Sequence, residues 1–229
     1  MPMTSERLRE LIAPARTAVL TMELQQGIVG DGAILPALPI AVRESGLLDV
    51  AGRVCTMARS IGVRVVHATF EERGDVVGHE HNTKIGALTA KYRAQAGAAP
   101  TDRGQSGVAL ALELDAHTSD ITVARMHGLT PFTGTELDAV MRSVGVRTIV
   151  LIGVSLNLGV IGAALSAVDL GYHVVIVRDA VIGLPREYGE AVLDNSLTMI
   201  ATIVTADEIV AAWSGDARVT HDEAPRDAN

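Results

Sequence analysis

Cysteine is almost absent from this chain of 229 residues, in which only Cys55 carries a thiol. A single cysteine cannot form an internal disulfide bond, so a reducing compartment is favoured and we expect a cytoplasmic protein. Aromatic residues make up only 3% of the sequence. That leaves little material for a surface that stacks nucleic-acid bases.

Long apolar runs and an excess of positive charge are missing as well. No apolar run reaches the roughly 18 residues that span a bilayer. The formal net charge of −8 makes nucleic acids and anionic membranes poor partners. Hydrophobic residues, at 48%, suffice for one large core. We therefore expect a single domain over residues 1–229, with its core at about 15–213 and a flexible tail at 215–229.

Short apolar runs that are typical of buried strands alternate with segments of helical spacing. The expected strands are 17–22, 63–69, 121–125, 148–152 and 173–177. The expected helices are 47–61, 135–144, 158–170 and a last helix that carries Trp213. Strands that alternate with helices in this way predict an α/β fold with a parallel sheet and right-handed crossovers.

Two stretches interrupt this alternation. Residues 27–45 are rich in glycine and proline and are expected to form a long loop. Residues 71–107 are polar and contain many glycines, with one helix-compatible piece near 82–95. Both stretches follow expected strands, so they belong at the carboxyl edge of the sheet, where such folds bind ligands.

The segment 148–160 predicts a buried strand, a turn and the start of a helix. In an α/β fold this junction usually displays a nucleophile. Here the helix opens on Gly159, which has no side chain. Cys55 lies far upstream at helical spacing with Leu48 and Ala51, where a small core residue is the simplest interpretation.

Several segments resemble the motifs of the isochorismatase-like hydrolases, a superfamily that includes nicotinamidases, other amidohydrolases and isochorismatases. They are 18–25, 125–137, 153–157, 169–172 and 179–180. The resemblance extends over residues 15–213. It implies a three-layer α/β/α sandwich around a six-stranded parallel, Rossmann-like sheet, and usually a homodimer or homotetramer.

Amidase members of this superfamily use an Asp, a Lys and a Cys. The Asp takes a proton from the thiol, the thiolate attacks an amide carbonyl, and the Lys supports the charges. Backbone N–H groups at the helix start hold the oxyanion. The matching positions here are Glu23, Arg125 and Gly159. Gly159 removes the nucleophile, so no acyl-enzyme can form at that position.

Two functions are compatible with these three residues. In the first, the protein hydrolyses a small carboxylate-bearing substrate without a thiol, as isochorismatases cleave a vinyl ether. Glu23 is then the general acid/base, Arg125 binds the substrate carboxylate, and Gly159 leaves space for substrate or water. In the second, the protein is an inactive pseudoenzyme that binds a small carboxylate or amide. Hydrolysis through Ser155 with a histidine close in space is a third, weaker alternative.

The resemblance and the polar segments suggest further ligand contacts. Val154 and Ser155 are expected to line the pocket, and Phe132 to form a pocket wall or interface. Arg73 is a candidate for substrate contact. We expect Glu23 and Arg125 to form a salt bridge.

The acidic residues near Arg73, which include Glu72 and Asp75, are expected to be solvated in a loop. His79 and His81 are two positions apart in that loop, which is weak evidence for metal ligands. We expect no metal and no cofactor.

Overall fold

The computed structural model describes residues 4–78 and 82–221. Its sheet has six strands, all parallel, in the order β3-β2-β1-β4-β5-β6. The strands are β1 Thr17–Met22, β2 Arg64–Phe70, β3 Ile121–Arg125, β4 Thr148–Val154, β5 His173–Ile182 and β6 Thr202–Val204. The predicted α/β/α sandwich is confirmed, and β4 and β5 run further than their expected ends at 152 and 177.

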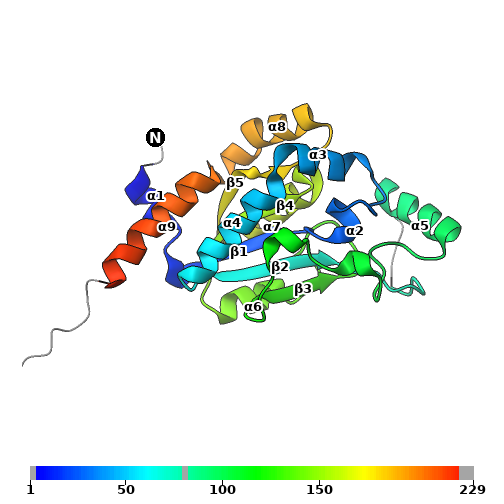
Figure 1. Ribbon diagram of the computed structural model, residues 1–229, viewed down its shortest axis with the longest axis horizontal. Helices are drawn as coiled ribbons and strands as arrows, with labels where there is room; N and C mark the ends of the chain where they lie inside the picture. The colour runs from blue at the N-terminus through cyan, green and yellow to red at the C-terminus, as the bar shows by residue number, and fades with distance from the viewer. Residues whose placement is uncertain (1–3, 79–81, 222–229) are drawn as a thin grey trace, which may run out of the picture.

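Helices cover both faces of the sheet (Figure 1). One apolar cluster joins the sheet to α1, α3, α4 and α9, and a second joins it to α6, α7 and α8. The helices are α1 Ser5–Leu11, α2 Gln26–Val29, α3 Ala37–Ser45, α4 Leu47–Ser60, α5 Lys84–Ala96, α6 Leu137–Ser143, α7 Ile161–Asp169, α8 Arg186–Asn195 and α9 Ala206–His221. None of the described helices is long and apolar enough to cross a membrane.

Alternate residues of the central strand β1 face the two clusters. Val19 belongs to the first cluster, whereas Leu20 and Met22 belong to the second. Every residue of β1 is buried, as expected for a strand covered on both sides. The C-terminal helix α9 closes the first cluster because Trp213 is fully buried and donates its indole N–H to the carbonyl of Ile12 at 2.9 Å.

One sequence expectation about the helices is wrong. Residues 27–45 contain α2 and α3 rather than one long loop. Leu38 and Val42 lie one turn apart on α3 and are buried in the first cluster, so core packing stabilises a helix in this Gly- and Pro-rich stretch. Pro36 and Pro39 sit at its start, where a missing N–H costs no helical hydrogen bond. Helix α9 ends at His221, within the segment 215–229 that was expected to be a tail.

A polar network is buried between β2, α4 and the turn before β3. His67 shares a hydrogen bond with Thr21 at 2.8 Å through Nδ1 and contacts Asp120 through Nε2 at 3.3 Å. Arg59 of α4 holds the same carboxylate with two bonds, of 3.0 and 2.8 Å. Burial lowers the pKa of His67 below its usual value. This histidine is therefore a satisfied core residue and no partner for a catalytic serine.

Candidate active site

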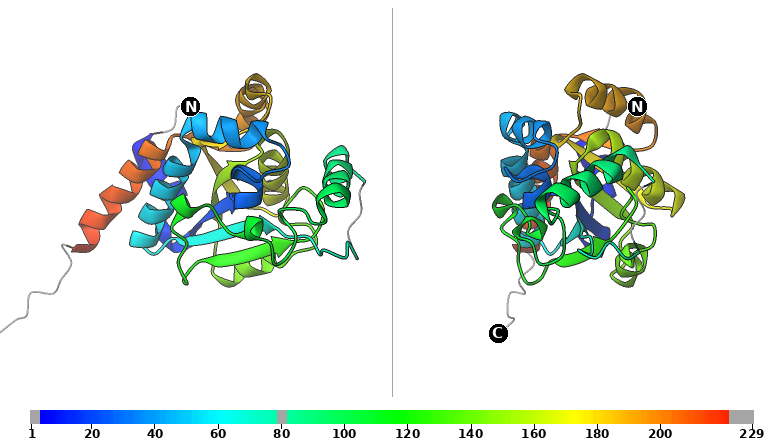
Figure 2. Two further views of the ribbon diagram at one scale, coloured as in Figure 1. Left: turned by 45° about the vertical axis from the view of Figure 1, so that its right-hand side comes forward. Right: turned by 90° about the vertical axis from the view of Figure 1, so that its right-hand side faces the viewer.

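A cavity of about 240 Å³ lies at the carboxyl edge of the sheet. The strand order reverses between β1 and β4, and in open α/β sheets that reversal creates a crevice for ligands. Residues that follow β1, β2 and β4, together with the last residue of β3, line the cavity. The remaining walls come from α2, the segment before α3, and α5, which lie at the same end of the molecule (Figure 2).

Glu23 follows the last residue of β1 and lines the cavity. Its φ of 54° is in the left-handed region, which is uncommon for a residue with a side chain. The backbone N–H of Glu23 donates to the carbonyl of Ala68 at 3.0 Å, which ties this strained residue to β2. Strained backbone of this kind concentrates at functional sites, where the surrounding structure holds it in place.

Arg125 ends β3 and forms an ion pair with Glu23, as expected from the sequence. The guanidinium also donates from Nε to the carbonyl of Gly128 at 3.3 Å and lies 5.0 Å from the centre of the Phe70 ring. Its side chain is 5% exposed, and within the described residues Nη1 has no hydrogen-bond partner. The site therefore holds a buried cation, and both N–H donors of its Nη1 are unused within the described residues.

The turn between β4 and α7 begins with a cis peptide bond between Val154 and Ser155. Ser155 donates from Oγ to the amide oxygen of Asn157 at 2.6 Å, and Asn157 in turn donates to the carbonyl of Leu184 at 2.9 Å. The amide of Leu158 donates to the carbonyl of Ser155 at 3.0 Å, so it is not free to hold an oxyanion. Ser155 lines the cavity, but its proton is bonded to an amide rather than to a base.

Gly159 lines the cavity on the same turn, but the space where a side chain would begin is already occupied. A Cβ atom at this position would lie 2.8 Å from the terminal methyl carbon of Met22. Met22 is fully buried at the end of β1. The expectation that Gly159 leaves space for substrate or water is therefore wrong at the Cβ position, because the methionine side chain fills it.

This contact predicts that Gly159→Ala lowers the free energy of unfolding by about 1 kcal/mol, since Met22 must shift within a packed core. Met22→Val, which shortens the neighbour, should recover the loss when combined with Gly159→Ala. Gly162→Ala is the matched control on α7, where the added methyl group meets Thr130 at 3.7 Å, an ordinary contact. Urea unfolding of Gly159→Ala, Met22→Val, the double variant and Gly162→Ala measures the effect. Equal stability of Gly159→Ala and Gly162→Ala would contradict the assignment.

Cys55 lies on α4, fully buried in the first cluster, and is not among the residues that line the cavity. Burial raises the pKa of its thiol to about 12, so the reactive thiolate is scarce at neutral pH. The chain has no other cysteine. Its position agrees with the expectation of a small core residue.

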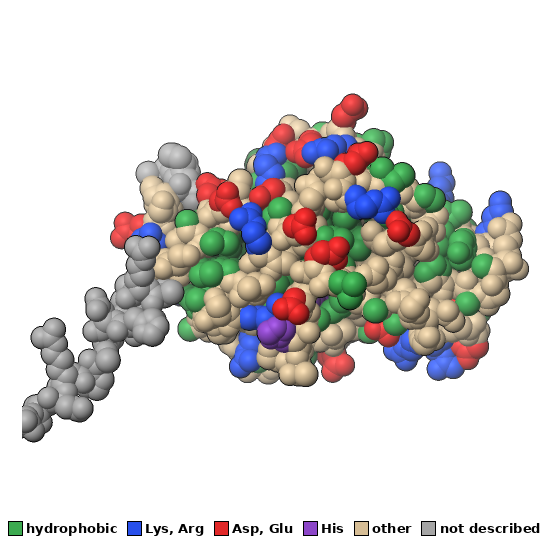
Figure 3. Space-filling view, viewed as in Figure 1, with side chains coloured by type: hydrophobic (Ala, Val, Ile, Leu, Met, Phe, Trp, Pro, Cys, Tyr) green, Lys and Arg blue, Asp and Glu red, His purple; other side chains and the backbone are tan. Residues whose placement is uncertain are grey.

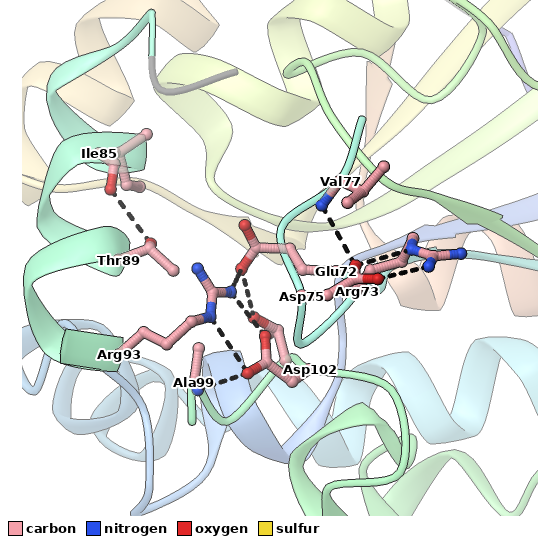
Figure 4. Close-up of polar contacts among 10 residues, drawn as sticks. Glu72, Arg73, Asp75, Val77, Ile85, Thr89, Arg93, Ala99 and Asp102 are labelled. Atoms are coloured by element: carbon pink, nitrogen blue, oxygen red, sulfur yellow. Dashed lines mark hydrogen bonds and ion pairs between the residues drawn. The ribbon is translucent and has the colours of Figure 1, made fainter. Parts of the chain in front are cut away.

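Glu72 was expected in a solvated loop, but it is fully buried and lines the cavity. Arg93 of α5 donates to it at 2.8 Å and forms two bonds with Asp102, of 3.2 and 2.6 Å (Figure 4). The hydrogen bonds that Arg93 donates to the Asp102 carboxylate raise the pKa of Arg93. The only signal in the sequence was position, because Glu72 is the second residue after β2 at the carboxyl edge of the sheet.

Three residues that were expected to contact the ligand lie outside the described lining of the cavity. Arg73 turns away to Asp75, with bonds of 2.9 and 2.5 Å, and its side chain is 49% exposed (Figure 4). That pairing lowers the pKa of Asp75 to about 2. Val154 is fully buried in the first cluster, and Phe132 packs in the second with its ring 6.1 Å from that of Tyr172. None of the three lines the cavity.

His79 and His81 lie outside the described residues. Within the described part of the chain, no group of three or more His, Cys, Asp or Glu side chains is arranged to hold a metal ion.

Comparison with known sequences agrees with the family resemblance. The family model for the isochorismatase domain matches residues 17–208. The isochorismatase family protein YecD of Escherichia coli O157:H7 is 36% identical over 100 residues, which are 43% of this chain and 52% of that protein. The ureidoacrylate amidohydrolase RutB of Pseudomonas syringae is 23% identical over 222 residues, covering 93% of this chain and 89% of the relative.

Comparison with solved structures gives the same fold. A cysteine hydrolase from Pseudomonas syringae pv. phaseolicola matches with a TM-score of 0.74 and 20% identity. The alignment covers 90% of this chain and 95% of that chain. At this level of identity the likeness extends to the fold.

Proposed function

The chain belongs to the isochorismatase family, and we propose that it is a hydrolase that acts without a cysteine nucleophile on a small carboxylate-bearing substrate. The observation that carries the proposal is the Glu23–Arg125 ion pair in the cavity, with Gly159 beside it. A carboxylate that faces a cavity can move protons, whereas the chain has no thiol there. The amidohydrolase activity of the RutB relative supports hydrolysis as the reaction class.

In this mechanism Arg125 and Glu23 have different roles. Arg125 lines the cavity, and its planar guanidinium suits a substrate carboxylate. Glu23 gives a proton to the leaving side of the substrate and recovers one from the attacking water, so the reaction consumes one water molecule and leaves the enzyme unchanged. Arg125 orients Glu23 through their hydrogen bond.

A second candidate function is ligand binding without turnover. The observation that favours it is the same ion pair, because a carboxylate already bonded to a guanidinium is less available for proton transfer. In this case the cavity binds a small carboxylate or amide, and no bond is broken.

Turnover assays separate the two candidates. Purified protein is offered isochorismate and a panel of small amides, before and after alkylation with iodoacetamide and in the Cys55→Ala variant. We expect turnover that neither treatment changes, since the thiol is buried away from the cavity. Loss of activity on alkylation would overturn a cysteine-independent mechanism. Saturable binding measured by thermal shift, with no turnover of any compound, would favour the binding protein.

A further inference from the structure

Most side chains around the cavity, away from the ion pair, are aliphatic. They come from two sides, with α2 and the segment before α3 on one and α5 with the turn before α7 on the other. Among the leucines and isoleucines of this wall are Ile28, Ile34, Leu35, Leu38, Ile85 and Leu158. Leu35 and Ile85 are each 38% exposed. Hydrophobic side chains lie among charged ones at the end of the molecule that carries α5 (Figure 3).

The polar side chains in the wall are largely engaged within the protein. Thr89 donates to the carbonyl of Ile85 at 3.1 Å, and Thr83 accepts the N–H of Gly86 at 3.0 Å. Ser155 is bonded to Asn157, as described above. A ligand therefore meets mainly hydrocarbon over most of the cavity, where binding follows the apolar area removed from water.

Aromatic stacking is a poor alternative for this ligand. Phe70 is the single aromatic side chain among the described residues that line the cavity. The guanidinium of Arg125 lies over its ring, so that face is already covered. A flat aromatic ligand would therefore compete with Arg125 for this face of the ring.

From this arrangement we propose that the site takes an aliphatic carboxylate or acyl compound, with its polar head at Arg125 and its alkyl chain between α3 and α5. The head contact rests on the function proposed above, whereas the chain contact rests on the aliphatic wall alone. The guanidinium of Arg125, which lines the cavity, supplies the positive charge for the head.

Calorimetric titration with butanoate, hexanoate and octanoate tests the contact between the alkyl chain of the ligand and the cavity wall. Benzoate is the aromatic comparison. Each buried methylene contributes about 0.8 kcal/mol, so we expect Kd to fall by about fourfold per methylene. Benzoate should bind no more tightly than butanoate. Equal affinity along the series, tightest binding of benzoate, or binding of none of these probes would overturn the proposal.

Two positions on α5 give a matched pair of variants. Ile85 lines the cavity and is 38% exposed, whereas Leu88 is 39% exposed and does not line it. Ile85→Ala should weaken octanoate binding by about fourfold or more and leave butanoate unchanged, whereas Leu88→Ala should change neither. Equal effects of the two variants would mean that octanoate binds elsewhere.

The head contact is tested separately, so the two proposals can fail independently. Octanol and octanoate are compared in the native protein and in Arg125→Met. If octanol binds as tightly as octanoate and Arg125→Met changes neither, the anion contact fails while the aliphatic wall stands. If Arg125→Met abolishes butanoate binding but chain length has no effect, the anion contact stands and the aliphatic proposal fails.

Discussion

Replacing Glu23 by glutamine is expected to reduce turnover by about a hundredfold or more, because general acid–base catalysis contributes factors of this size. The amide is isosteric with the carboxylate, and its oxygen still accepts the N–H of Arg125, so the cavity keeps its shape. What the variant loses is the proton. Steady-state kinetics with the best substrate of the panel measures the loss in kcat.

Glu71→Gln is the matched control for this experiment. Glu71 lies after the same strand as Glu72 but does not line the cavity, and its side chain contacts Thr69 and Arg103 at 3.2 and 3.8 Å. We expect its kcat to remain that of the native protein. If Glu23→Gln retains turnover within a few-fold of native, proton transfer takes place at another residue and the proposed mechanism is wrong.

Replacing Arg93 by methionine is expected to detach α5 from the cavity. Thr89 and Arg93 are the only buried residues of this helix, so ionic contacts rather than an apolar face hold it in place. Without Arg93, the buried carboxylates of Glu72 and Asp102 lose their shared guanidinium. Removing one partner from a buried ion pair costs about 3–5 kcal/mol.

The expected result is local rather than global unfolding. Hydrogen exchange of the amides in residues 84–96 should accelerate strongly in Arg93→Met, while amides of β1 and β4 remain protected. Lys91→Met is the control, because Lys91 is exposed on the same helix. If the amides of residues 84–96 exchange at the same rate in Arg93→Met and in Lys91→Met, the ionic contacts do not anchor α5.

The sequence was informative where a local pattern carries the structure. Near-continuous apolar runs predicted β1, β4 and β5, because strands buried on both faces have no polar side. At residues 27–45 the glycine and proline content led to a wrong prediction of a loop. Burial of Leu38 and Val42 in the core stabilises α3 by more than the low helix propensity of the segment destabilises it.

The ligand contacts were harder to predict than the fold. Arg73 and Glu72 are neighbours in the sequence, yet one pairs with Asp75 at the surface and the other is buried in the cavity wall. Spacing along the chain cannot separate them, because the direction in which each side chain leaves a loop is decided by its partners. Glu72 is fixed by Arg93, which lies 21 positions away.

The sequence by itself determined the fold class and the lack of a thiol at the β4–α7 turn. Each follows from residue identity and local pattern. Only the tertiary structure decided that Glu23 and Arg125, 102 positions apart, form a pair, and that Met22 occupies the space beside Gly159. These contacts join residues from different strands, and only the packed parallel sheet brings those residues close to one another.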